Sequence, residues 1–281
     1  MKTIRIKSLF QSLLYFAIAM AVSLFVSLSI VVVFSFLLGF NHDTGTNTMQ
    51  EQFERLALNS NIQKILLLMF FEIILIIFGP WHWYSVRKGE MFSPREAMTA
   101  NNLFMAVLIG FFTQIFSGAI ITVIYVVMPS WVDHYSKIME DAFATNTSPL
   151  LVFMSVVIIG PIAEELLFRG MIFRVLRKGF SLYIAAFVSS LFFSVYHMNI
   201  VQGIYAFFIG FLLCVLYEKT QTFWYTAVVH IIFNGSSFFV QWVGEEFGEM
   251  SEINTIILWV LSLGIISSAV QKVSVNRKVL D

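Results

Sequence analysis

Residues 97–132 read AMTANNLFMAVLIGFFTQIFSGAIITVIYVVMPSWV and contain no Asp, Glu, Lys or Arg. An α-helix needs about 20 apolar residues to cross the hydrocarbon core of a bilayer, so this run is long enough to span a membrane. Charge-free runs also extend from Ser8 to His42 and from Ala142 to Ala163. The chain of 281 residues is 58% hydrophobic and 12% charged, with a mean hydropathy of +0.83. These values exclude a soluble globular domain and predict an integral membrane protein.

Further apolar segments complete the predicted bundle. The charge-free run over residues 179–217 is too long for one crossing, and a polar turn inside it divides it into two helices; that turn is marked by Met198, Asn199, Gln202 and Gly203. Residues 62–83, 220–244 and 253–271 each supply one more helix. We therefore expect an all-α, polytopic bundle of about eight transmembrane helices, with residues 1–281 forming one membrane domain.

The basic residues predict the orientation of this bundle. In the eight-helix arrangement, 14 of the 17 Lys and Arg residues fall in loops on the side that holds both termini. Cytoplasmic loops collect Lys and Arg, so we expect both termini in the cytoplasm and the protein in the cell membrane. The formal net charge is zero and no basic block is present, which argues against a nucleic-acid partner.

Two adjacent carboxylates fall inside the fourth predicted helix, in the stretch IIGPIAEELLFRG at residues 158–170. An ionisable side chain in the membrane costs about 2.5 kcal/mol or more at the helix centre, so each needs a partner or a function. Glu165 precedes Arg169 by four residues, a spacing that predicts an ion pair on one helix face. We expect either single substitution to be destabilising and reversal of both charges to restore the fold in part. Glu164 points about 100° away and is the candidate functional carboxylate.

Polar residues recur on two later helices. The fifth ends in FFSVYHMN, which places Phe193 and His197 on one face, and the seventh contains HIIFN, which places His230 and Asn234 on another. A lone membrane histidine is usually a hydrogen-bonded packing residue, but two histidines with Asn and Glu favour a functional site. Counting helix rise from the expected helix starts puts His197 about 24 Å and His230 about 12 Å up, so helical tilt or displacement is needed to bring them level.

Three motifs in this order resemble those of the CPBP family of intramembrane proteases, which includes CAAX prenyl endopeptidases and bacterial Abi proteins associated with bacteriocin processing and self-immunity. EExxxR is matched at residues 164–169, FxxxH at 193–197 and HxxxN at 230–234. The resemblance covers residues 149–240, the predicted catalytic core. It implies that Glu164 and His197 activate a water and that His230 and Asn234 stabilise the oxyanion, with Glu165 and Arg169 in support. That chemistry suits peptide-bond hydrolysis.

Two alternatives use the same residues. Glu164, His197 and His230 could bind a catalytic zinc ion, so the sequence leaves open whether the protein uses no cofactor or one divalent metal. A non-catalytic transporter or scaffold could instead combine them with Glu72 in an ion relay. An aspartyl protease is excluded, because the aspartates lie outside the predicted spans. The HExxH motif of site-2-type metalloproteases and the GxSG motif of rhomboids are missing, which argues against both classes. The expected partner is a peptide or membrane-protein substrate, such as a prenylated tail or a bacteriocin leader, within the lipid bilayer.

Overall fold

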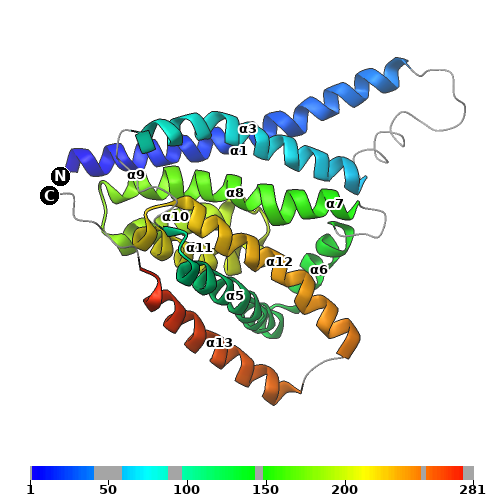
Figure 1. The fold of residues 1–281 in the computed structure, drawn as a ribbon. Coiled ribbons are helices and arrows are strands. Elements are labelled where there is room, and N and C mark those ends of the chain that lie inside the picture. The colour runs from blue at the N-terminus through cyan, green and yellow to red at the C-terminus, as the bar shows by residue number, and fades with distance from the viewer. Residues whose placement is uncertain (1, 41–58, 88–96, 143–147, 248–250, 275–281) are drawn as a thin grey trace, which may run out of the picture.

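The computed structural model describes residues 2–40, 59–87, 97–142, 148–247 and 251–274, and every regular element in these ranges is a helix. The chain runs back and forth through one bundle, in which the beginning of the first helix and the end of the last lie at the same end (Figure 1). The elements are α1 (Lys2–Phe40), α3 (Ser60–Arg87), α5 (Ala100–Val127), α6 (Pro129–Ala142), α7 (Pro149–Val152), η1 (Phe153–Ile159), α8 (Gly160–Glu165), η2 (Leu166–Phe173), α9 (Arg174–Arg177), α10 (Leu182–Tyr196), α11 (Ile200–Thr220), α12 (Phe223–Phe247) and α13 (Glu252–Lys272).

The predicted polytopic bundle is confirmed, with one difference in its count. Seven helical segments within the described residues are long and apolar enough to span a membrane. The predicted helix that falls short is the fifth, which corresponds to α10. It has 15 residues and therefore a length of only about 22 Å at 1.5 Å per residue. It forms a hairpin with α11, in which Gly203 approaches Ser194 so closely that a Cβ would come within 3.0 Å of the serine hydroxyl.

The third predicted helix is shorter than its charge-free run. It ends at Val127, and Pro129 begins the separate helix α6, because proline is well suited to the first turn of a helix. His134 lies on this helix. The expected helix start at Ala142 was also wrong, since Ala142 ends α6; residues 143–147 lie outside the described ranges and the fourth span begins at Pro149.

That fourth span, Pro149–Arg177, is the centre of the bundle. Half of its most apolar stretch is buried, the same share as in α11, against 11% in α13. It changes from π-helix to α-helix at Gly160–Pro161 and returns to π-helix after Glu165. Proline has no N–H to donate within a helix, and here the Gly160 N–H bonds back to Ser155, five residues earlier. Such π-helical turns are frequent at functional sites.

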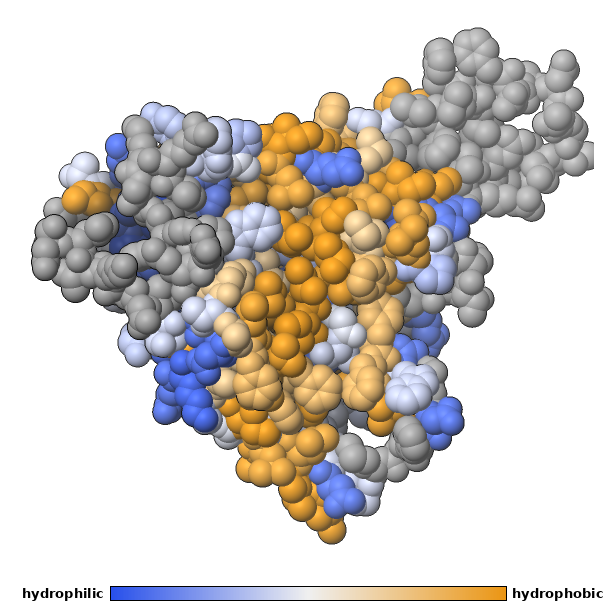
Figure 2. Space-filling model, viewed as in Figure 1, coloured by the Kyte–Doolittle hydropathy of each residue, from blue (hydrophilic) through white to orange (hydrophobic). Residues whose placement is uncertain are grey.

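The outer surface matches a lipid environment. Figure 2 shows a broad hydrophobic band across the face in view, with hydrophilic residues on both sides of it. Large apolar side chains are exposed on α1, α3, α5 and α13, including Phe25, Ile76, Val126 and Val260. An exposed apolar surface of this extent marks a membrane-contacting face rather than a soluble one. The protein is therefore an integral membrane protein.

Candidate active site

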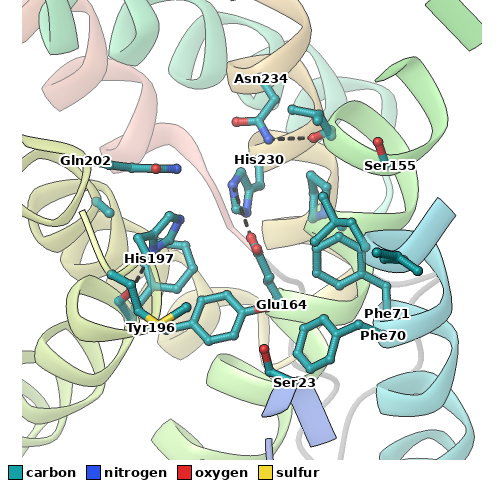
Figure 3. Close-up of a pocket in the computed structure, with 18 of the residues that line it drawn as sticks. Ser23, Phe70, Phe71, Ser155, Glu164, Tyr196, His197, Gln202, His230 and Asn234 are labelled. Carbon is teal, nitrogen blue, oxygen red and sulfur yellow. Dashed lines mark hydrogen bonds and ion pairs between the residues drawn. The ribbon is translucent and has the colours of Figure 1, made fainter. Parts of the chain in front are cut away.

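The four predicted catalytic side chains line one cavity of about 470 Å³ inside the bundle: Glu164 on α8, His197 directly after α10, and His230 and Asn234 on α12. Figure 3 shows them facing the same space. The difference in height that was predicted from helix rise does not keep His197 and His230 apart, because both line this cavity. Opposite these residues, the cavity wall is completed by α1 and α3, which contribute Ser23, Phe70 and Phe71.

Glu165 connects the site to the predicted ion pair. Its Oε1 lies 2.6 Å from Arg169 Nη1, and both side chains are buried, so the ion pair expected from their spacing is present. The same oxygen lies 3.0 Å from Nδ1 of His230, a contact that sequence spacing could not indicate. An ionised carboxylate only accepts hydrogen bonds, so Nδ1 donates in this contact and Nε2 faces the cavity. Nε2 lies 3.8 Å from Oε2 of Glu164.

Phe193, one helical turn before His197, contacts both Arg169 and His197. The Arg169 guanidinium lies over the Phe193 ring, 4.5 Å from its centroid, and Arg169 also donates to the Gly210 carbonyl at 3.1 Å. The backbone carbonyl of Phe193 lies 2.7 Å from Nδ1 of His197. Because a carbonyl only accepts, Nδ1 carries the proton and Nε2 of His197 is left as an acceptor. Phe193 therefore packs against the Arg169 side of the ion pair with its ring and orients the His197 imidazole with its backbone carbonyl.

Asn234 is oriented by a backbone contact. Its Nδ2 donates to the carbonyl of Val156 at 2.7 Å, in the π-helical turn η1 (Figure 3). One amide proton is therefore committed, and the second proton and the carbonyl oxygen remain for other partners. The contact fixes the plane of the amide and links α12 to the helix that carries Glu164.

Zinc ligation is not supported by this arrangement. Among the described residues, no group of three or more His, Cys, Asp and Glu side chains is placed to hold a metal ion. The contacts to Glu165 and to the Phe193 carbonyl use Nδ1 of each ring and leave Nε2 available, so the mismatch lies in the placement of the three side chains and not in the supply of ring nitrogens. The set Glu164, His197 and His230 does not fit a metal centre in this geometry, and we assign it no metal-dependent step.

Two further residues bear on the alternatives. Glu72, which the relay hypothesis required, is exposed on α3 and does not line the cavity. Gln202 in the first turn of α11 does line it, and its side chain points toward the space in front of His230 (Figure 3). The sequence marked Gln202 only as part of a turn; the signal that could have identified it is an amide placed five residues after His197, at the start of an apolar helix.

Residues 146–236 match the family model described as "Type II CAAX prenyl endopeptidase Rce1-like", and this segment contains all three motifs. This part of the chain is therefore similar to that family. A curated Bacillus subtilis (strain 168) protein named "Putative membrane peptidase YdiL" is 31% identical over 86 residues, or 31% of this chain. The chain spans about a third of that relative's length, since the match covers 35% of it. No solved structure matches the chain.

Proposed function

We propose that this protein is an intramembrane endopeptidase that hydrolyses a peptide bond with a water molecule activated by Glu164 and His197. The observation that carries the proposal is the convergence of four side chains from three helical segments on one cavity within an apolar bundle. The match of residues 146–236 to the family model adds weight to peptidase activity. The exposed position of Glu72 weighs against the transporter alternative, because a relay needs its groups in series.

The proposed reaction begins with a water held between Glu164 and the free Nε2 of His197. Glu164 accepts one proton as the water oxygen attacks the substrate carbonyl carbon. The carbonyl oxygen becomes an oxyanion, which accepts hydrogen bonds from the second amide proton of Asn234 and from Nε2 of His230 when that ring is doubly protonated. As the C–N bond breaks, the proton held by Glu164 passes to the departing nitrogen. The products are a carboxylic acid and an amine.

The supporting residues act by holding His230 in place. Glu165 fixes the imidazole through Nδ1, and Arg169 holds Glu165 while contacting both Gly210 and the Phe193 ring. Hydrogen-bond donors stabilise an oxyanion best when they are already positioned before reaction. The network therefore supports positioning roles for Glu165 and Arg169.

The cavity composition favours a substrate with an apolar segment. Its wall on α3 is mostly apolar. Leu66, Leu67, Phe70 and Phe71 line it together with Gln63, and α1 adds Val26 between Ser23 and Ser27. A transmembrane helix end or a lipid-modified tail would each meet this wall. The 149–240 core holds the catalytic residues, but it forms the cavity only together with α1 and α3, which supports one functional membrane domain.

The decisive experiment is a cleavage assay with detergent-purified protein. The substrates are a panel of peptides with one apolar segment of about 20 residues joined to varied polar segments. Glu164→Gln should reduce turnover by about 1,000-fold or more, because the group that accepts the proton is lost while substrate binding is retained. Glu72→Gln is the matched control and should cleave at the wild-type rate. Equal turnover by all three proteins would refute the proposed role of Glu164.

A chelator separates the carboxylate mechanism from a zinc enzyme. Activity should persist in the chelator, and elemental analysis of the active protein should find less than one metal ion per chain. Loss of activity on chelation, with recovery on adding zinc, would contradict the metal-free mechanism. Activity itself would remain consistent with a peptidase, so the two parts of the proposal fail separately.

A further inference from the structure

A second cavity, of about 400 Å³, lies between α6 and the segment that carries His197. Helix α6 lines it with Trp131, His134 and Ile138, which are spaced three and four residues apart and therefore share one helix face. A volume of this size falls within the range of about 300–1,000 Å³ that is usual for ligand sites. Neither the three motifs nor the proposed catalytic step uses this cavity.

A neighbouring face of α6 holds the helix against the bundle. Val132 and Tyr135 pack with Ile124 of α5 and Val201 of α11. The hydroxyl of Tyr135 lies 3.1 Å from the hydroxyl of Tyr205, a residue that lines the catalytic cavity. Helix α6 therefore has one face for packing and another for the second cavity, and its anchor is part of the wall of the active site.

Only a thin partition separates the two cavities. His197, Met198 and Gln202 line both of them. Met198 has a φ of 50° and a side chain that is 75% exposed. A left-handed backbone costs a residue with a Cβ roughly 1–2 kcal/mol, so the surrounding structure must hold this turn in place. Asn199 does so, because its side chain accepts from the backbone N–H of Gln202 at 3.0 Å and caps α11.

Gln202 is suited to bind a polypeptide backbone at this partition. Within the described part of the chain its side-chain amide makes no hydrogen bond, and only its backbone N–H is engaged. The amide can donate to a carbonyl and accept from an N–H, the two groups that an extended peptide presents. In Figure 3 it lies near His197 and its amide end points toward His230. A peptide chain held there would lie against both histidines.

We propose that the α6 cavity is a substrate subsite that binds the polar segment of a polypeptide where it leaves the membrane. This inference rests on the proposed peptidase function. The apolar segment occupies the cavity lined by α1 and α3, the chain crosses the partition beside His197, and the next residues enter the α6 cavity. His134 and Asn199 provide polar contacts there, and Trp131 and Ile138 provide apolar ones. The scissile bond would then lie at the edge of the membrane segment.

Two versions of one peptide from the cleavage panel test this inference: a long form with a polar extension of six residues beyond the cleavage site and a short form without it. Ile138→Trp fills the α6 cavity, and Lys137→Trp adds the same indole at an exposed position that lines neither cavity. The long-to-short ratio of kcat/KM should fall at least tenfold in Ile138→Trp, which corresponds to about 1.4 kcal/mol of lost discrimination. Lys137→Trp should keep the wild-type ratio. An unchanged ratio in a folded Ile138→Trp protein would overturn the subsite.

Disulfide capture provides a readout that does not need turnover. In a Cys214→Ala background, Ile138→Cys should form a disulfide with a long peptide that carries one cysteine in its polar extension, and Lys137→Cys should not. If the wild-type protein cleaves no peptide but capture is selective for position 138, the subsite stands and the peptidase proposal fails. Equal capture at both positions overturns the subsite even if cleavage occurs. A third outcome would also overturn the inference. If capture is selective for position 138, and vesicles of anionic phospholipid prevent it whereas the short peptide does not, the cavity binds lipid headgroups.

Discussion

The ion pair between Glu165 and Arg169 provides a stability test that distinguishes an isolated pair from a network. Glu165→Gln leaves the Arg169 guanidinium buried without a charged partner, and removing one member of a buried pair costs about 3–5 kcal/mol. Arg169→Met leaves the carboxylate buried in the same way. The double variant Glu165→Gln/Arg169→Met should lose less than the sum of the two, because no charge is left uncompensated.

Charge reversal is the informative variant. Sequence spacing alone suggested that Glu165→Arg/Arg169→Glu would partly restore the fold, but the structure gives Arg169 two further contacts. Its hydrogen bond to the Gly210 carbonyl is of the charged kind, worth about 1.5–3 kcal/mol, and its contact with the Phe193 ring adds about 2 kcal/mol when desolvated. A carboxylate at position 169 would face the carbonyl oxygen and the negative ring face. We therefore expect the reversed protein to be no more stable than either single variant.

Equilibrium unfolding in mixed detergent micelles measures these differences as free energies of unfolding. The control is Glu218→Gln, which breaks the ion pair between Glu218 and Arg177. In that pair the Arg177 side chain is 30% exposed and the Glu218 side chain 29%. A partly exposed pair contributes about 0–1 kcal/mol, so the control should change little. The reasoning would be refuted if the free energy of unfolding of the reversed variant came within about 1 kcal/mol of the wild-type value, because an ion pair without other contacts would tolerate the reversal in this way.

Three other measurements test the remaining structural arguments. Gly160→Ala should lower the free energy of unfolding by about 1–3 kcal/mol, because the new Cβ would lie 2.5 Å from a backbone carbonyl oxygen. In the control Gly264→Ala the new Cβ meets nothing within 4 Å and should be tolerated, so equal losses in the two variants would contradict this argument. Tyr135→Phe removes a hydroxyl contact between α6 and α11 and should cost about 1 kcal/mol in the same unfolding assay, and no loss would show that packing alone anchors α6. Reporters fused after Lys178 and after Glu249, a residue outside the described ranges, should be cytoplasmic and external respectively, and the reverse result would overturn the orientation predicted from the basic residues.

Much of the fold was predictable because the bilayer imposes a simple requirement on the chain. Each spanning helix must be long and apolar, so its position is visible as a long apolar run with few charges, and the structure has seven such segments within the described residues. The Glu165–Arg169 pair was equally accessible, because residues four apart on one helix are neighbours whatever the rest of the protein does. The motif residues were recognisable since ionisable groups are rare in membrane segments.

Tertiary packing decided the rest, because those contacts join residues far apart in the chain. No spacing rule brings His230 to Glu165, Arg169 to the Phe193 ring, or Asn234 to the Val156 carbonyl. The length of α10 and the separate helix α6 were also hidden, since an apolar run records hydrophobicity and does not record where a helix bends or ends. Sequence thus determined which polar residues enter the membrane, whereas the packing of α1, α3, α8, α10, α11 and α12 determined that they meet around one cavity.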